Sequence, residues 1–415
     1  MVWRFLLPWG GQRTMVVALP EETTSAMRNR IKTAMVVSTC GRSHAIGGWN
    51  WRSMRQDLYL DYTSINQSFL HNIGVMSSLR VLTLRGIGLN GSLPNKGWCE
   101  LSNLQELDLS DNGFKGMLPS CFGDLTSTRL LDLSSNQFTR NLALSPLTNL
   151  TTLEYLFLSY NHFEIQPSFI SFFNHSKHKI PEHLVIGCSL LSFLQLSNNN
   201  LYDQISPLFV NSSLEYLYLD NNHFVGKIPD IMSLPPSLVV IGISNNHLSR
   251  ELPKWMGNMT GLNGINMFSN HFEGPIPIEL CKLGQLEFLD LLENNLSGYI
   301  PSCFNSSSMM IHVHLNQNKL RGPMTFSLFN SSSLVTLGVS DNNLSGTISS
   351  WIGTLSTLSI LVLKFNNFEG EILVQLCQLK QLTILDLSQN NFSGLIPHCF
   401  IDIPFETTYT KSSVI

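Results

Sequence analysis

Two stretches decide the fold: LEFLDLLENNLSGYIP at residues 286–301 and LTILDLSQNNFSGLIP at residues 382–397. Both read LxxLxLxxNxLxGxIP, with Phe admitted at the last apolar position before Gly. Their Asn294 and Asn390 belong to a column that recurs along most of the chain. Self-similarity at a fixed period of roughly 20–50 residues is the signature of a repeat architecture. The sequence therefore predicts one solenoid and not a set of globular domains.

The Asn column has twelve members, and one degenerate unit with Ile87 in that column precedes them, which makes thirteen units. From Asn222 onward the step is 24 residues seven times in succession, and the earlier steps are 25, 24, 25, 38 and 23 residues. The 38-residue step predicts an irregular insertion at 162–198. The members of the column are Asn112, Asn136, Asn161, Asn199, Asn222, Asn246, Asn270, Asn294, Asn318, Asn342, Asn366 and Asn390.

The chemistry of the columns predicts how each unit folds. Leucines that alternate in LxLxx point to one face of a short strand, and strands of successive units stack into a parallel sheet at about 4.8 Å. A buried Asn amide both donates to and accepts from backbone groups of neighbouring units, so the column should form a hydrogen-bonded ladder. In the return segment, Gly permits a positive φ. Pro fixes φ there and has no backbone N–H to donate a hydrogen bond. The fold class is thus a horseshoe with a parallel concave sheet of about 13 repeats and a convex side of irregular or 3-10 structure.

These patterns divide the chain into three parts. Residues 59–400 should form the solenoid, with strands from about residue 80 to 388. Residues 1–58 contain no repeat and include the polar run EETTSAMRNRIK, so we expect a poorly structured segment without a recognisable cap. Residues 401–415 should form a disordered tail.

Composition excludes several functions. Charged residues make up 13% of the chain, against about 25% in soluble proteins. The net charge of −4 gives no basic field for nucleic acid or an anionic membrane. The sequence has no apolar run of about 18 residues, so it predicts no transmembrane helix. The two N-terminal apolar patches are too interrupted for a clear secretion signal. Kinase and NTPase motifs are absent, so the sequence predicts neither catalysis nor a cofactor.

Two motifs resemble cofactor or metal sites without the context that such sites need. Gly86–Gly91 matches GxGxxG but leads into Ser-Leu-Pro and no helix, so repeat glycines explain it. His312 and His314 share one face of a strand, but no Cys or carboxylate is fixed nearby by the pattern. We interpret them as exposed, hydrogen-bonding histidines and expect no metal.

The GxIP half of the repeat, at Gly274–Pro277, Gly298–Pro301 and Gly394–Pro397, resembles the plant extracellular subtype of leucine-rich repeat. Over roughly residues 60–400, the chain is similar to the ectodomain of plant leucine-rich-repeat receptor-like proteins. The resemblance implies a non-catalytic ectodomain in defence or developmental signalling, secreted or on the extracellular face of the plasma membrane. Its expected partners are a peptide, glycan or protein ligand and a co-receptor kinase.

The chain departs from that family at both ends. Family members carry cysteine-paired caps and a membrane helix, whereas residues 1–58 hold only Cys40 and no membrane helix is predicted. We therefore expect a fragment or truncated form of a receptor. The alternative is a secreted leucine-rich-repeat inhibitor of cell-wall-degrading enzymes, although such inhibitors have intact cysteine caps.

Three cysteine pairs share one spacing of 22 residues: Cys99–Cys121, Cys281–Cys303 and Cys377–Cys399. In each pair the cysteines lie 13 before and 9 after the Asn of their unit, which places them two positions apart on adjacent coils. That separation is within disulfide reach, and the resemblance implies an oxidising compartment. The alternative is a set of free, buried thiols that share a register because the repeats do.

Eleven Asn-x-Ser/Thr sequons occur, and those in the outward-facing return segments suit glycosylation of a secreted protein. The five predicted acceptors are Asn149, Asn211, Asn258, Asn305 and Asn330.

The fourth to sixth units carry aromatic residues at strand positions that should face the concave side. A cluster of exposed aromatics predicts a binding site, since such residues dominate interaction hot spots. The alternative is that Tyr and Phe are simply favourable strand residues. The predicted ligand contacts are Tyr155, Phe157, Tyr160, Phe193, Tyr216, Tyr218 and Asp220.

Overall fold

A computed structural model describes residues 56–142, 145–164, 190–205, 213–228, 237–302, 309–324 and 333–403. These residues belong to one compact unit, Arg55–Phe405. The predictions for residues 1–55 and for most of the tail, 404–415, lie outside the described residues. Across the described ranges, the structure contains no helix with the length and hydropathy needed to span a bilayer.

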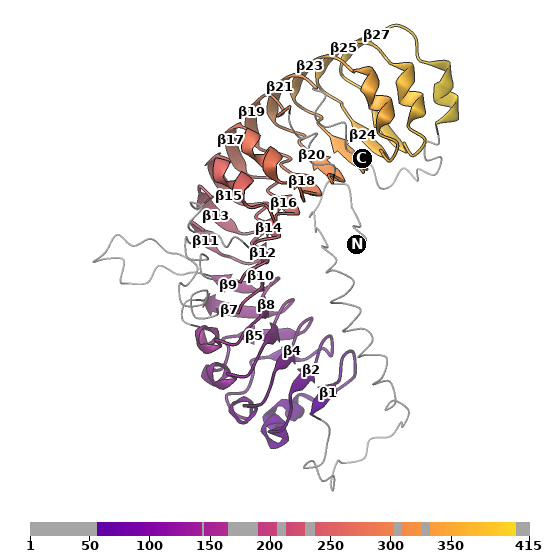
Figure 1. The fold of residues 1–415 in the computed structure, drawn as a ribbon. Coiled ribbons are helices and arrows are strands. Elements are labelled where there is room, and N and C mark those ends of the chain that lie inside the picture. The colour runs from indigo at the N-terminus through magenta and orange to yellow at the C-terminus, as the bar shows by residue number, and fades with distance from the viewer. Residues whose placement is uncertain are drawn as a thin grey trace, which may run out of the picture. The chain divides into compact units, whose positions relative to one another are not determined.

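One strand per coil builds a continuous parallel sheet, which confirms the solenoid with a concave sheet (Figure 1). Each strand is three residues long and pairs in register with the equivalent residues of the next coil. The sheet contains β1 (Asp57–Tyr59), β2 (Val81–Thr83), β4 (Glu106–Asp108), β6 (Leu130–Asp132), β8 (Tyr155–Phe157), β10 (Phe193–Gln195), β12 (Tyr216–Tyr218), β14 (Val240–Gly242), β16 (Gly264–Asn266), β18 (Phe288–Asp290), β20 (His312–His314), β22 (Thr336–Gly338), β24 (Ile360–Val362) and β26 (Ile384–Asp386).

This sheet has 14 strands, one more than the thirteen units that the sequence shows. The additional strand, β1, pairs with β2 and places Leu58 and Leu60 against the core. Thr63 stands in the Asn column of this coil, and its hydroxyl donates to the Leu60 carbonyl at 2.6 Å. The sequence pattern does not reveal this coil because it lacks both the Asn and the glycine of the return half, which Gln67 replaces, whereas the Ile87 unit keeps Gly91 and Pro94.

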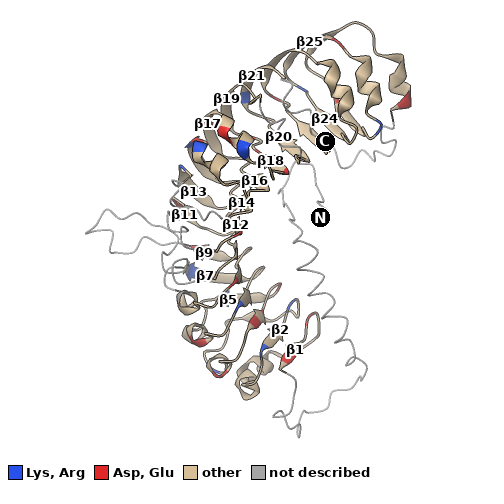
Figure 2. Ribbon diagram, in the orientation of Figure 1, with Lys and Arg blue, Asp and Glu red and all other residues tan. Residues whose placement is uncertain are grey.

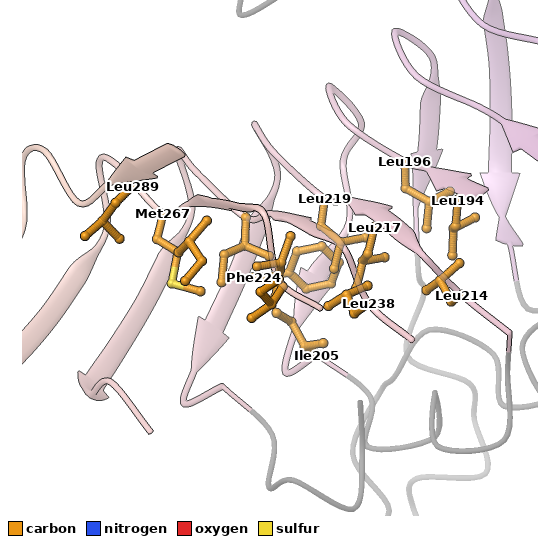
Figure 3. Close-up of a cluster of buried hydrophobic side chains, with 14 of the residues drawn as sticks. Leu194, Leu196, Ile205, Leu214, Leu217, Leu219, Phe224, Leu238, Met267 and Leu289 are labelled. Atoms are coloured by element: carbon orange, nitrogen blue, oxygen red, sulfur yellow. The ribbon is translucent and has the colours of Figure 1, made fainter. Parts of the chain in front are cut away.

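Leucines of the LxL pattern point away from the solvent-facing side of the sheet and form one continuous core. Figure 3 shows this packing around Leu217 and Leu219 of β12, with Phe224 beside them. Two positions after Asn, Phe side chains of adjacent coils stack, with ring centroids 6.2 Å apart for Phe114 and Phe138. Burial of a leucine or phenylalanine contributes about 1.5–3 kcal/mol, and each coil obtains that burial only from its neighbours.

The twelve asparagines form the predicted ladder. The Asn136 Oδ1 accepts a hydrogen bond from the Phe114 N–H of the previous coil at 3.0 Å. Its Nδ2 donates to the carbonyls of Leu109 at 2.9 Å, Ser134 at 3.1 Å and Leu133 at 3.2 Å. The same pattern recurs in the other coils, so each amide satisfies backbone groups of two coils.

A left-handed backbone position directly precedes the Asn column, and the sequence pattern does not reveal it. Thirteen non-glycine residues there have φ between 49° and 58°. Their side chains range from Ser to Tyr and Phe, so residue type does not mark the position. The sequence located a positive φ only at the glycines of the return segment, where it is also found, for example at Gly298 with φ 77°.

A second ladder follows the Asn column, and the insertion divides it in two. The large sheet continues across residues 162–198, because Phe193 of β10 pairs with Tyr155 of β8. The second ladder is interrupted there, and the bridge Glu164↔Asn200 links its parts among the described residues. Its strands are β3 (Asn90–Gly91), β5 (Gly113–Gly116), β7 (Gln137–Asn141) and β9 (His162–Glu164), then β11 (Tyr202–Asp203), β13 (His223–Gly226), β15 (His247–Glu251), β17 (His271–Pro275), β19 (Asn295–Gly298), β21 (Lys319–Pro323), β23 (Asn343–Thr347), β25 (Asn367–Glu371) and β27 (Asn391–Ser393).

Short 3-10 helices occupy the return segments, as the pattern predicts. Most start after a residue with extended backbone such as Pro253 or Pro277. They are η2 (Gln67–His71), η3 (Ile73–Met76), η4 (Trp98–Glu100), η5 (Ser120–Asp124), η7 (Pro146–Asn149), η11 (Lys254–Asn258), η12 (Ile278–Lys282), η15 (Ser350–Thr354), η16 (Val374–Gln378) and η17 (His398–Asp402).

Candidate ligand-binding face

Strands β8, β10 and β12 bring five aromatic side chains together on the solvent-facing side of the large sheet. The register pairs Phe193 with Tyr155 and with Tyr216, as the period predicts. The Phe193 ring centroid lies 4.7 Å from that of Phe157 and 5.6 Å from those of Tyr216 and Tyr218. We call these five residues the aromatic cluster: the rings of Phe157, Tyr216 and Tyr218 pack around Phe193, and Tyr155 lies beside Phe193 in the register. Few charged residues lie along the strands of the large sheet (Figure 2).

The aromatic cluster is less exposed than the sequence suggests. Phe193 is 5% exposed and Tyr218 is 7% exposed, since neighbouring rings cover them. Burial, and to a lesser degree the charge of Asp220, raises the pKa of the Tyr218 hydroxyl. Tyr155, Phe157 and Tyr216 are half-buried and form the accessible surface of the cluster.

Tyr160 does not belong to this cluster. It occupies the left-handed position before Asn161, with φ 55°, and its side chain is 43% exposed. The sequence prediction grouped it with the strand aromatics because the pattern does not show where this column turns away from the sheet rows.

Asp220 is bound to the sheet and does not project freely into solvent as the sequence prediction assumed. Its Oδ1 accepts from the Ser244 hydroxyl at 2.6 Å and from the Ser244 N–H at 2.9 Å, and its Oδ2 accepts from the Ser197 hydroxyl at 3.3 Å. Its side chain lies across Gly242, where a Cβ would meet the carboxylate at 2.7 Å. Burial raises the pKa of Asp220. We therefore assign Asp220 a structural role and remove it from the proposed ligand contacts.

His312 and His314 form hydrogen bonds, but the prediction that both are exposed is wrong. His312 is 5% exposed, and burial lowers its pKa to about 4. The Thr336 hydroxyl lies 2.9 Å from the His312 Nδ1 and 2.9 Å from the His314 Nε2, while the His314 Nδ1 lies 3.3 Å from the Asp290 Oδ2. These contacts join three strands of the large sheet. No group of three or more His, Cys, Asp or Glu side chains within the described ranges is arranged to hold a metal ion.

The three cysteine pairs differ although their spacing is the same. Cys377 and Cys399 form a disulfide. Cys281 is also disulfide-bonded, and Cys303 lies outside the described residues.

The first pair, Cys99 and Cys121, corrects the prediction, because both are free thiols. The Cys121 thiol donates to the Asn95 carbonyl at 3.9 Å. Burial raises its pKa to about 12, which disfavours the thiolate needed for exchange.

Two of the predicted glycosylation acceptors fall within the described residues. Asn149 ends η7 and Asn258 ends η11, and both are exposed. Their glycosylation stays a prediction. Asn211, Asn305 and Asn330 lie outside the described residues.

The structure also shows a groove that is not among the sites predicted from the sequence. It follows β13, β15 and β17 and has a volume of about 1010 Å³. The imidazole rings of His223, His247 and His271 stack along it, with centroids 6.0 and 5.9 Å apart. The signal was present in the sequence, because His directly follows the Asn in three successive units.

Comparison with known proteins supports the repeat assignment. Models of the leucine-rich repeat match residues 95–138, 213–234, 285–307, 333–355 and 381–403. Cuscuta receptor 1 from Solanum lycopersicum is 35% identical over 195 residues, which are 46% of this chain and 16% of that protein. Receptor-like protein 1 from Arabidopsis thaliana is 32% identical over 168 residues, which are 40% of this chain and 15% of that protein. The chain thus matches only a small part of these relatives.

Solved structures of plant receptor ectodomains share the fold. The ectodomain of the Arabidopsis receptor kinase HAESA, in complex with an extended IDA peptide hormone, has a TM-score of 0.71 and 31% identity. That match covers 82% of this chain and 55% of the HAESA chain. The PEPR1–AtPEP1 complex has a TM-score of 0.69 and 28% identity, covering 80% of this chain and 48% of that chain.

Proposed function

Because the chain is a leucine-rich-repeat protein related to plant receptor-like proteins, we propose that its solenoid is a peptide-binding ectodomain segment of a plant cell-surface receptor. It acts by recognition and not by catalysis. Peptides lie on the solvent-facing side of the large sheet, centred on Tyr155, Phe157 and Tyr216.

The aromatic cluster is the observation that carries this proposal. It places packed, rigid rings on three adjacent strands, with Tyr155, Phe157 and Tyr216 accessible at the surface. Rigid aromatic anchors contribute most of the affinity in typical interfaces because they bury a large area at little entropic cost. The HAESA ectodomain structure contains a bound peptide hormone, which supports a peptide as the ligand class.

The location and partners follow from the same relationship. We place the segment on the extracellular face of the plasma membrane or in the secreted fraction, with a co-receptor kinase as the signalling partner. A glycan ligand stays a second prediction of the family resemblance. The alternative function, an inhibitor of cell-wall-degrading enzymes, is not favoured by the relatives, which are named as receptors.

A selection experiment tests the proposal and does not require the ligand to be identified first. The full chain, made in a secretory host, is used to select binders from a phage-displayed library of extended peptides. The same selection is repeated with the double variant Tyr155→Ala/Tyr216→Ala and with Tyr299→Ala. Tyr299 is a suitable control because it is 60% exposed and lies outside the large sheet.

The expected result is a common peptide motif that binds the wild type and Tyr299→Ala. The double variant should lose at least about 2 kcal/mol of binding free energy, the scale of a hot spot. Equal binding by all three proteins, or no enriched motif, would contradict the proposed site.

A further inference from the structure

A second pocket lies away from the large sheet, where β15 runs into η11. It has a volume of about 490 Å³ and is lined by three cationic side chains, Lys227, Arg250 and Lys254. Pro253 and the half-buried Trp255 form its apolar wall. The volume is within the range of small-molecule sites, about 300–1,000 Å³.

Arg250 stands where the fold favours glycine. Four residues after the Asn, the backbone is left-handed, and Arg250 adopts φ 77° there. A residue with a Cβ is strained in this conformation, and such strain concentrates at functional sites. In most coils the equivalent residue is a glycine with φ between 74° and 83°, namely Gly91, Gly116, Gly226, Gly274, Gly298, Gly322, Gly346, Gly370 and Gly394.

The carboxylates of this pocket offset only part of its positive charge. Glu251 and Glu273 also line it, which leaves one net positive charge among the five ionisable side chains. The Glu251 side chain lies over Gly274, since a Cβ there would meet the Glu251 Cγ at 2.8 Å. Neither Arg250 nor Lys254 has an ion-pair partner among the residues that the structure describes.

We propose that this pocket binds an oxyanion carried on a ring, such as a sulfated or phosphorylated tyrosine or a sugar acid. The Arg250 guanidinium offers a planar fork of donors that matches carboxylate, sulfate and phosphate oxygens. Lys254 and Lys227 add point charge, and the Trp255 and Pro253 wall supports the flat body of the ring. The site is separate from the aromatic cluster and does not depend on the function proposed above.

Two Arg→Gly variants distinguish binding at this pocket from a general effect of lost positive charge. Arg250→Gly removes the guanidinium and restores the residue that the column favours, so folding should not suffer. Arg140→Gly makes the same exchange at the same column position, where Arg140 is exposed with φ 92°, in a coil that does not line the pocket. Thermal unfolding of both variants confirms that the solenoid is intact.

Binding is measured by isothermal titration calorimetry with small probes. The anionic probes are O-sulfotyrosine, O-phosphotyrosine and galacturonate, and the uncharged controls are tyrosine and galactose. At least one anionic probe should bind wild type and Arg140→Gly equally, at least about tenfold more weakly to Arg250→Gly, and more weakly at high salt.

The probes also identify the source of the ring. Binding of the tyrosine esters alone indicates a modified peptide, binding of galacturonate alone indicates an acidic glycan, and binding of both supports the shared chemistry. The proposal is overturned if no anionic probe binds wild type, if the uncharged controls bind as well, or if Arg140→Gly weakens binding as much as Arg250→Gly.

Discussion

Replacing Asn270 by Leu should break the ladder at one defined point. Asn270 is 5% exposed, and its Oδ1 accepts from the Leu248 N–H at 3.0 Å. Its Nδ2 donates to the Ile243 carbonyl of the preceding coil at 3.0 Å, and to the carbonyls of Phe268 at 3.2 Å and Met267 at 3.3 Å. Leu fills a similar volume but can form none of these hydrogen bonds.

The magnitude follows from the groups that lose their partner. A buried polar group without a hydrogen bond costs about 1–3 kcal/mol. The Leu248 N–H and the Ile243 carbonyl are both affected in the neighbouring coil, so Asn270→Leu should lower the free energy of unfolding by about 3–5 kcal/mol. The control is His271→Leu, because His271 is the next residue and is exposed, and its ring stacks on that of His247.

Urea denaturation gives the free energy of unfolding, and hydrogen exchange localises the damage. The Leu248 amide should exchange faster in Asn270→Leu, while the Phe272 amide, bound to the Asn294 Oδ1, should keep its protection. A loss of less than about 1 kcal/mol relative to His271→Leu, with Leu248 still protected, would refute the reasoning.

Three further changes test other parts of the structure. Burial, and to a lesser degree the charge of Asp108, raises the pKa of Asp132 from 3.8 to about 7. Between these two values the folded chain holds a proton that the unfolded chain releases. The free energy of unfolding therefore falls as pH rises from about 4 to 7. Asp132→Asn should be more stable than wild type at pH 8 and equal to it below pH 4, as measured by urea denaturation at each pH. Cys377→Ser opens a loop of 22 residues and should cost about 3 kcal/mol under oxidising conditions and nothing in reductant. Gly257→Ala should lower the melting temperature sharply, because the new Cβ would collide with the Glu279 carbonyl oxygen. Gly261→Ala should not, because its Cβ would meet no atom closer than 3.8 Å.

The sequence predicts the backbone of this fold well because, in a solenoid, residues at equivalent repeat positions pair in the sheet, so the repeat period determines the strand register. Once Asn161, Asn199 and Asn222 are aligned, the pairing of Phe193 with Tyr155 and Tyr216 follows, and the structure confirms it. The coil around β1 does not match the pattern because Thr63 replaces the Asn and Gln67 replaces the Gly of the return half. A repeat is recognised in the sequence by its Asn and Gly, whereas the coil folds because its leucines pack into the core.

Exposure in the candidate site could not be predicted in the same way. Whether Tyr218 faces solvent depends on the rings beside it and on Gly242, which gives Asp220 room to bend across the sheet. Those side-chain conformations are set by the neighbours on both adjacent strands and not by the column pattern. The cysteine pairs show the same limit: a shared spacing fixes the register of the coils, but Cys99 and Cys121 are free thiols while Cys377 and Cys399, at the same spacing, are bonded.

The interrupted second ladder has a consequence for how force and unfolding spread along the protein. From β3 onward, strand pairing in two ladders couples most coils to the next. Between β9 and β11 the described residues contribute the large sheet, the hydrogen bonds of the Asn199 amide and the single bridge Glu164↔Asn200. In a linear array, cooperativity is set by the weakest nearest-neighbour coupling. The coils before and after this junction should therefore behave as two cooperative blocks, and stretching the chain from its ends should separate them at β8 and β10 before either block unravels.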